Sequence, residues 1–267
     1  MIYNAKEGIL QTSRGRTVYL SFGTGERPLI MIQGLNTNGI KGAAVSMAFL
    51  YRIFARDYRV YLFERREQVP PNITVRDMAE DLAAAMDALG LRDAHVLGVS
   101  QGGMIAQYLA IDRPDLVGKL VLAVTAARNN DTLTDTVRRW IELTERGEMR
   151  ELVTDMAERM YSAAYVRRYR PFLPLLTVLQ KPKDVNRFLA LTRACLTCDS
   201  YEDLDRITCP TLVIGGREDK VVGGAASEEI AHRLGCECCL YDGLGHAAYE
   251  EAKDFNRRVY DFLMGVE

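Results

Sequence analysis

The sequence predicts an α/β protein with a mostly parallel, doubly wound sheet, and three features of the 267-residue chain lead to this fold class. Short, continuous apolar runs alternate with helical patterns, as they do when strands are buried on both faces beneath helices. A segment of alternating apolar and polar residues comes before them and predicts an N-terminal antiparallel hairpin. A long stretch after the fourth apolar run holds only helical patterns, which predicts an all-helical cap insertion between two strands.

The strands are predicted from local patterns. Residues 17–22 alternate apolar and polar side chains, and a turn at 13–16 joins them to a partner strand at 9–12, so these segments form the hairpin. The apolar runs that we expect to be parallel strands cover residues 29–32, 58–63, 94–97, 120–124, 211–214 and 238–241.

The helices between these strands follow from apolar residues at helical spacing. From Thr74 to Leu89 the apolar residues fall on one stripe, with Thr74 as a candidate N-cap and Gly90 as a stop signal. Further helical patterns outside the insertion cover residues 101–111, 226–234 and 254–264.

The insertion lies between the strands at 120–124 and 211–214 and contains helical patterns at 133–145, 149–160 and 184–196. We therefore divide the chain into a core of residues 1–128 and 207–267 and a helical cap of residues 129–206. Such an insertion is expected to fold over the carboxyl ends of the strands, where α/β sheets bind their ligands.

Composition narrows the classes of partner. There are 34 Lys and Arg against 36 Asp and Glu, for a net charge of −2, and this balance argues against nucleic acid as the main partner. The apolar run at 120–127 is far shorter than the roughly 18 residues that a membrane-spanning helix needs. The first residues lack the pattern of a secretory signal, so we expect a cytoplasmic protein.

Six cysteines are then expected to be reduced thiols. Four of them, Cys195, Cys198, Cys236 and Cys239, are candidates for a set of zinc ligands. The second pair does not form a tight zinc knuckle, so we favour small buried hydrophobic residues and expect no metal site.

The motif Gly98-x-Ser100-x-Gly102 lies directly after a predicted strand and directly before a predicted helix. A serine hydroxyl is a poor nucleophile unless it is exposed, held rigidly and placed beside a base. A tight strand-to-helix turn holds a serine in this way, and its crowding requires glycine at positions 98 and 102. The turn also directs the backbone N–H of Gln101 toward a developing negative charge. The motif therefore predicts a nucleophilic Ser100, and the alternative is a chance occurrence of the same spacing in a glycine-rich loop.

With this motif, the chain resembles the α/β-hydrolase fold superfamily over nearly its full length. The hairpin, the serine turn, the helical insertion and two later loops occur in the order that is typical of that family. The resemblance implies a triad in the order serine, acid, histidine. It implies Asp219 as the acid, in a Gly-x-x-Asp loop, with Glu218 as the neighbour most easily confused with it. It implies His246 as the base, in a Gly-His loop after the last strand.

The resemblance also implies an oxyanion hole formed by the backbone N–H groups of Leu35 and Gln101. Relatives usually carry His-Gly in the loop before Leu35, whereas this chain has Gln33-Gly34. The donor is a backbone group, so we expect an intact hole with a somewhat altered loop. A second departure is the segment 64–71, which replaces a Gly-rich stretch of many relatives.

Side chains of the cap are candidates for setting substrate choice. We predict Trp140, Met160, Tyr161 and Tyr165 as substrate-binding residues, and Met156 and Phe172 are further candidates. The alternative for each is a place in the core of the cap. Arg167, Arg168 and Arg170 either meet an anionic substrate or form a solvated cationic face, and we favour the latter.

Together these residues predict a serine hydrolase that cleaves carboxylic esters of small to medium size without a cofactor. An enol-lactonase or a hydrolase of carbon–carbon bonds would use the same triad. A non-catalytic ligand receptor on this fold is an alternative of another class. We expect a small-molecule ester or lactone as the partner, and a monomer or a homodimer.

Overall fold

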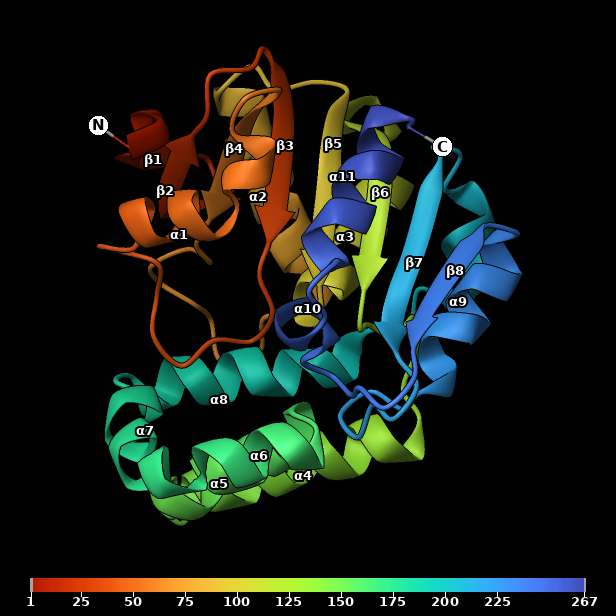
Figure 1. Cartoon of the computed structure of the whole chain (residues 1–267). Helices are drawn as coiled ribbons and strands as arrows, with labels where there is room; N and C mark the ends of the chain where they lie inside the picture. The colour runs from red at the N-terminus through yellow and green to blue at the C-terminus, as the bar shows by residue number, and fades with distance from the viewer. Residues whose placement is uncertain (1, 267) are drawn as a thin grey trace.

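The computed structural model describes residues 2–266, apart from the side chains of residues 2, 173, 174, 176 and 177. One eight-stranded sheet in the order β1-β2-β4-β3-β5-β6-β7-β8 runs through the molecule (Figure 1). Its strands are β1 (Lys6–Thr12), β2 (Gly15–Phe22), β3 (Arg27–Ile32), β4 (Tyr58–Phe63), β5 (Ala94–Val99), β6 (Val117–Ala123), β7 (Thr211–Gly216) and β8 (Glu237–Tyr241).

The pairing within the sheet matches the predicted fold class. β1 pairs with β2 and β2 with β4 in antiparallel fashion, whereas every pair from β4 through β8 is parallel. All residues of β5 and β7 are buried, because neighbouring strands flank both of them and helices cover both of their faces. The prediction of a mostly parallel α/β sheet with an N-terminal hairpin is confirmed.

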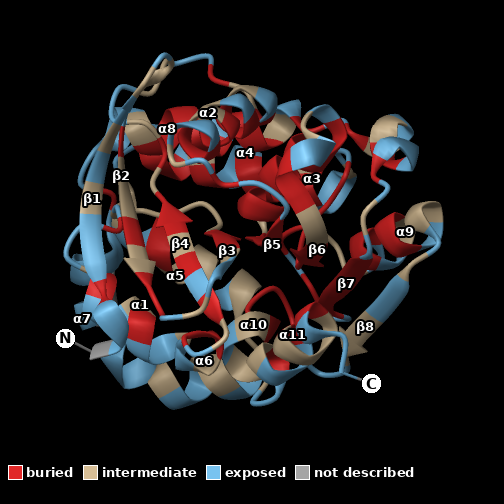
Figure 2. Cartoon of the chain, turned by 90° about the horizontal axis from the view of Figure 1, so that it is seen from above, coloured by how far each residue is buried: buried red, intermediate tan, exposed pale blue. Residues whose placement is uncertain are grey.

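Helices pack on both faces of the sheet, and alternate strand residues supply the two cores (Figure 2). Ile30 and Val96 pack with α2 and α3 on one face, while Leu29 and Leu97 pack with α1 and α11 on the other. The helices around the sheet are α1 (Ala44–Leu50), α2 (Val75–Ala88), α3 (Gln101–Asp112), α9 (Ala225–Leu234), α10 (Ala248–Glu251) and α11 (Phe255–Met264). Of these, α1 and α10 were not predicted from the sequence.

The inserted segment is helical and lies across the end of the sheet toward which the parallel strands point (Figure 1). Its helices are α4 (Asp131–Glu145), α5 (Met149–Met160), α6 (Ala163–Tyr169), α7 (Leu173–Gln180) and α8 (Val185–Ala194). The three predicted helices are present, and α6 and α7 are additional. The division at residues 129–206 into core and cap stays a prediction.

Short 3-10 helices complete the described secondary structure, at Ile2–Asn4, Arg52–Phe54, Pro114–Leu116, Arg170–Phe172, Cys195–Thr197 and Tyr201–Arg206. Within residues 2–266, no helix combines the length and the apolar character needed to cross a bilayer. Cys195 and Cys198 are buried as expected of small hydrophobic residues, whereas Cys238 is exposed at the edge strand β8, where the prediction of burial was wrong.

A capping box fixes the start of α2. The Thr74 hydroxyl accepts the Asp77 N–H at 3.0 Å, and the Asp77 carboxylate accepts the Thr74 N–H at 2.9 Å. We expect Thr74→Ala to lower the free energy of unfolding by about 1 kcal/mol, measured by urea denaturation, because two backbone donors depend on this pair. Thr154→Ala, in the middle of α5, is the control and should be close to neutral. An equal loss in both variants would contradict a specific role for the cap.

Candidate active site

Ser100 occupies a strained turn between β5 and α3. Its φ of 55° and ψ of −121° lie in a region that residues other than glycine rarely adopt. The surroundings hold this conformation, since the Ser100 N–H donates to the carbonyl of Ala123 at 2.9 Å. The Thr125 hydroxyl donates to the Ser100 carbonyl at 2.8 Å. The hydroxyl of Ser100 is thereby presented at the carboxyl end of the sheet.

Glycines allow the close approach of the chain segments around this turn. A Cβ atom at Gly102 would lie 2.0 Å from the carbonyl oxygen of Ile32, and one at Gly98 would lie 2.5 Å from the carbonyl oxygen of Gly102. At Gly34 a Cβ atom would lie 3.2 Å from the Cβ of Ser100. The start of α3 therefore packs directly against the loop that follows β3.

His246 is within hydrogen-bond distance of both other residues predicted for the triad. Its Nε2 lies 2.9 Å from the Ser100 hydroxyl oxygen, and its Nδ1 lies 2.8 Å from a carboxylate oxygen of Asp219. An ionised carboxylate only accepts hydrogen bonds, so Nδ1 carries the proton and donates it to Asp219. Nε2 is then free to accept a hydrogen bond from the Ser100 hydroxyl, which is the arrangement that a general base requires.

The two loops that hold Asp219 and His246 are anchored by the backbone. The second carboxylate oxygen of Asp219 accepts the N–H groups of Val221 and Val222 at 2.8 and 3.0 Å. Asp219 is buried, whereas the adjacent Glu218 is exposed. The N–H of Ala247 donates to the carbonyl of Met160 at 2.7 Å, which joins the histidine loop to the end of α5.

The residues predicted for the oxyanion hole flank Ser100 in the loop after β3 and at the first position of α3. Within residues 2–266, the backbone N–H groups of Leu35 and Gln101 have no protein acceptor. For Gln101 this follows from its place in the first turn of a helix, where N–H groups have no intrahelical partner. Two free donors beside the serine are able to bind an oxyanion.

A cavity of about 470 Å³ lies between the loop after β3 and the helices α5 and α6. Met160, Tyr161 and Tyr165, three of the predicted substrate-binding residues, line it, and so does Met156. Its described lining comprises Leu35, Asn36, Thr37, Asn38, Val153, Met156, Ala157, Met160, Tyr161, Tyr165, Val166, Tyr169, Gln180 and Glu250.

Trp140 lies elsewhere, which corrects the sequence-based expectation. It is buried in the core between α4 and α5, and its indole N–H donates to Asp155 at 2.8 Å. A helical stripe of apolar residues places Trp140 toward the core of the cap, and its single donor is already used there. Phe172 is 56% exposed and is absent from the described lining of the cavity.

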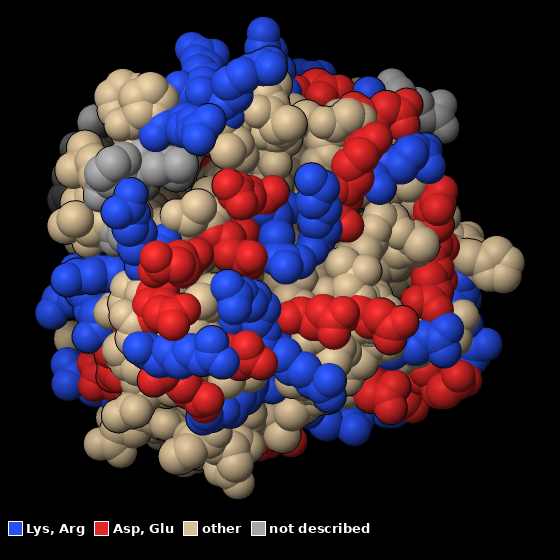
Figure 3. Space-filling view, turned by 90° about the horizontal axis from the view of Figure 1, so that it is seen from below, with Lys and Arg blue, Asp and Glu red and all other residues tan. Residues whose placement is uncertain are grey.

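Charge is distributed unevenly between the cavity and the surface of the cap. Glu250 is the only charged residue in the described lining, and the Tyr161 hydroxyl donates to it at 2.7 Å. The rings of Tyr161 and Tyr165 stack with centroids 4.3 Å apart, and the ring of Tyr169 packs against Tyr165 at 4.4 Å with a tilt of 35°. Arg167, Arg168 and Arg170 do not line the cavity. Acidic and basic side chains both cover the underside of the cap (Figure 3).

The arrangement of a strained serine turn, a histidine and a buried aspartate fits the result of a comparison with known protein families. A model described as the alpha/beta hydrolase family matches residues 42–258. The chain belongs to this alpha/beta hydrolase family.

Three proteins that are similar to this alpha/beta hydrolase are named for three different reactions. RutD of Pseudomonas syringae pv. syringae, provisionally named a carbamate hydrolase, is 27% identical over 239 residues, covering 85% of this chain and 92% of its own. A 2-hydroxy-6-oxononadienedioate/2-hydroxy-6-oxononatrienedioate hydrolase of a Pseudomonas species is 28% identical and covers 77% of each chain. The solved enol-lactonase of Burkholderia xenovorans LB400 has a TM-score of 0.82 at 22% identity, over 96% of this chain and all of its own.

Sequence reasoning missed one residue of this alpha/beta hydrolase site. Arg65, the second residue after β4, is buried, and its guanidinium donates to the carbonyl of Gln33 at 2.7 Å. The sequence indicated only that the segment 64–71 departs from the family pattern. An arginine is usually exposed, so nothing in the local pattern places its head group in the interior.

The two neighbouring acids of this alpha/beta hydrolase can be told apart by mutation. We expect Asp219→Asn to slow the labelling of Ser100 by a fluorophosphonate probe on the order of 10⁴-fold, because the amide no longer fixes the histidine tautomer. Glu218→Gln should leave labelling unchanged, since Glu218 is exposed. Rates of labelling under pseudo-first-order conditions measure both. Slow labelling in Glu218→Gln with normal labelling in Asp219→Asn would reverse the assignment.

Proposed function

We propose that the chain is a serine hydrolase that cleaves carboxylic esters of small to medium size through an acyl-enzyme. The observation that carries the proposal is the continuous hydrogen-bonded path from Ser100 through His246 to Asp219, with spacings of 2.9 and 2.8 Å. Membership of the alpha/beta hydrolase family supports hydrolysis as the reaction.

The first half-reaction transfers the acyl group to the enzyme. His246 Nε2 takes the proton of the Ser100 hydroxyl while the oxygen attacks the carbonyl carbon of the ester. The carbonyl oxygen becomes an anion and is bound by the N–H groups of Leu35 and Gln101. The tetrahedral intermediate then collapses, the bond to the alcohol oxygen breaks, and the imidazolium returns its proton to the leaving alcohol.

The second half-reaction repeats these steps with water. His246 accepts a proton from a water molecule, and the resulting hydroxide attacks the acyl carbon bound to Ser100. When the second intermediate collapses, the bond between the acyl carbon and the Ser100 oxygen breaks and the imidazolium of His246 returns its proton to that oxygen. The carboxylic acid leaves, and the serine hydroxyl and neutral histidine are restored. Asp219 stays ionised throughout and stabilises the imidazolium in both halves.

The cavity beside the oxyanion loop supports a neutral, largely apolar substrate. Its described wall carries Val153, Met156 and Met160 together with the stacked tyrosines. The carboxylate of Glu250 disfavours a negative charge on the substrate. The volume of the cavity, about 470 Å³, falls within the range of pockets that hold small organic ligands.

The alternatives on the same triad differ from this proposal in the charge of the substrate. One relative is named for a dioate, a substrate with two carboxylates. No described residue of this cavity carries a positive charge to pair with a carboxylate, so we favour an ester over such carbon–carbon cleavage. Uncharged lactones and carbamates remain chemically suitable, and a receptor that does not turn over is the remaining alternative.

A panel of acyl substrates tests the proposal. We expect hydrolysis of neutral p-nitrophenyl esters, followed by absorbance, because their carbonyl meets the serine and both proposed oxyanion donors. Ser100→Ala should abolish turnover while the protein keeps its unfolding midpoint. Cleavage of lactones or carbamates without ester cleavage would replace the proposed substrate class. Failure of both turnover and probe labelling in folded protein would favour the receptor.

Removing the charge in the cavity tests the predicted preference for neutral substrates. We expect Glu250→Gln to raise kcat/KM for an anionic hemisuccinate ester about fivefold, since Glu250 is exposed and a unit charge in water contributes about 1 kcal/mol at close range. The rate for a neutral ester of similar size should stay the same. Steady-state kinetics on the two esters measure the ratio.

Glu251→Gln is the matched control, because Glu251 is the next residue and is absent from the described lining of the cavity. It hydrogen-bonds with Ser162 instead, at 2.6 and 2.9 Å. An equal gain in this control would mean that the overall field of the protein, and not a contact in the cavity, sets the preference.

A further inference from the structure

The loop that carries Leu35 is not held by the side chain that replaces the family's histidine. The amide nitrogen of Gln33 is buried and has no hydrogen-bond partner in the described part of the chain. The carbonyl of Gln33 is bound instead, by a 2.7 Å hydrogen bond from the Arg65 guanidinium. The main chain two residues before Leu35 is thus fixed by Arg65.

The same guanidinium nitrogen also reaches the other segment of the site. Nη2 of Arg65 lies 3.3 Å from the side-chain oxygen of Gln101. The amide nitrogen of Gln101 in turn donates to the Leu191 carbonyl at 2.7 Å and to the Cys195 sulfur at 3.2 Å. One cation therefore bridges the two segments whose backbone N–H groups form the proposed oxyanion hole, and Gln101 links it to α8.

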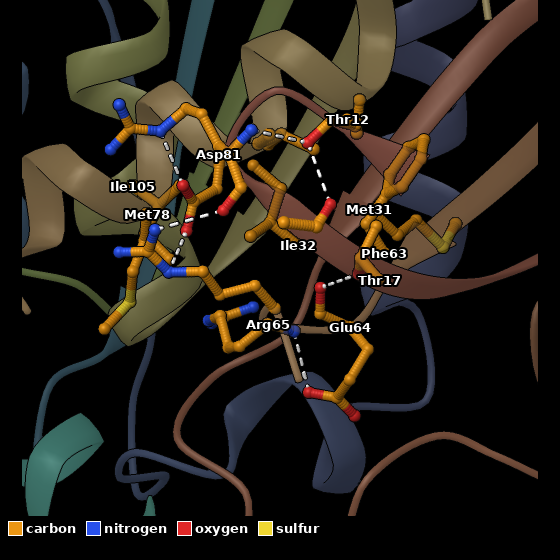
Figure 4. Close-up of a pocket in the computed structure, with 15 residues that line it drawn as sticks. Thr12, Thr17, Met31, Ile32, Phe63, Glu64, Arg65, Met78, Asp81 and Ile105 are labelled. Carbon is orange, nitrogen blue, oxygen red and sulfur yellow. Dashed lines mark hydrogen bonds and ion pairs between the residues drawn. The ribbon is translucent and has the colours of Figure 1, made fainter. Parts of the chain in front are cut away.

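Arg65 is buried without a carboxylate partner. It is 7% exposed, and among the described residues no carboxylate oxygen lies within 4 Å of its guanidinium, although Glu64 is its neighbour in sequence. The Glu64 carboxylate is used by other groups, the N–H of Ile40 and of Arg65 itself, each at 2.8 Å, and the guanidinium of Arg187 at 3.3 Å. Figure 4 shows Glu64 and Arg65 side by side at the small cavity bounded by Ile32 and Phe63.

Such a charge is costly to bury. Burial lowers the pKa of Arg65 to about 10, which still leaves it protonated at neutral pH. The charge of the nearby Glu64 carboxylate opposes this lowering of the pKa only in part. A buried cation without a directly paired carboxylate is destabilising. In the proposed reaction, an anion forms at the two N–H groups that this guanidinium bridges.

We propose that Arg65 is a positioning residue for the oxyanion hole. Its guanidinium fixes the Leu35 loop relative to Gln101, and its positive charge stabilises the oxyanion. The inference rests on the proposed function, because it concerns the intermediate of that reaction. In this chain Arg65 would hold the loop that relatives are expected to hold with the histidine side chain that Gln33 replaces. In the described part of the chain, the Arg65 side chain is hydrogen-bonded to Gln33 and Gln101, and to neither the serine nor the histidine of the triad.

Arg65→Met and Arg65→Lys test the inference. We expect Arg65→Met to lower kcat on a neutral p-nitrophenyl ester about 100-fold, the effect of losing one oxyanion donor, with KM within about threefold of the wild type. Arg65→Lys keeps the charge but not the planar set of donors, and its kcat should be about tenfold lower than that of the wild type. Steady-state kinetics with active-site titration correct each rate for the fraction of competent sites.

A transition-state analogue separates this role from a structural one. A trifluoromethyl ketone adds to the serine as an anionic hemiketal, whereas the corresponding unactivated ether binds only through its shape. We expect the inhibition constant of the ketone to rise in each variant by the same factor as kcat falls, and that of the ether to stay the same. A general change in packing would instead weaken the binding of the ketone and of the ether by a similar factor.

Arg66→Gln is the matched control, because Arg66 is the next residue and pairs with Asp81 at 3.1 Å, away from both oxyanion segments. Its kcat should equal that of the wild type. The inference is overturned if Arg65→Lys retains wild-type kcat, or if the ether loses as much affinity as the ketone; Arg65→Lys decides the matter if Arg65→Met does not fold. Turnover and Ser100 labelling of the wild-type protein test the proposed function separately.

Discussion

The contact between the start of α3 and the end of β3 is the constraint on which the site depends. At Gly102 the two segments are so close that a Cβ atom would lie 2.0 Å from the Ile32 carbonyl oxygen. This approach places the loop with Leu35 next to the first N–H of α3, and it fixes the positive φ of Ser100. A strained serine conformation of this kind costs about 1–3 kcal/mol, which the surrounding sheet and helix packing must offset.

Parallel strands turn this local constraint into a site. The strands β3, β5, β7 and β8 run in the same direction, so the loops that follow them all emerge at one end of the sheet. Asp219 and His246 follow β7 and β8 directly, and short loops leave them little conformational freedom. The hydrogen bond between Ala247 and Met160 further ties the histidine loop to α5, so the helices over the sheet also define the geometry of the base.

Most of the fold was predictable because its signals are local. Continuous apolar runs identify buried parallel strands, and the glycine spacing around Ser100 identifies a tight turn, so both appear in any short window of sequence. The exposure of Cys238 was not predictable in this way, because it depends on which edge of the sheet is covered. The helices α6 and α7 were missed because Pro171 and Pro174 interrupt the pattern there.

Arg65 is the strongest example of a role that only tertiary structure reveals. In sequence, Gln33 and the segment 64–71 are two separate departures from the family pattern. In the structure the two departures are in contact, because the Arg65 guanidinium donates to the Gln33 carbonyl. The amide nitrogen of the Gln33 side chain has no hydrogen-bond partner in the described part of the chain. A buried cation is a poor stabiliser compared with an apolar side chain of the same size. Its presence at this position is therefore better explained by the anion that the proposed reaction forms than by the stability of the fold.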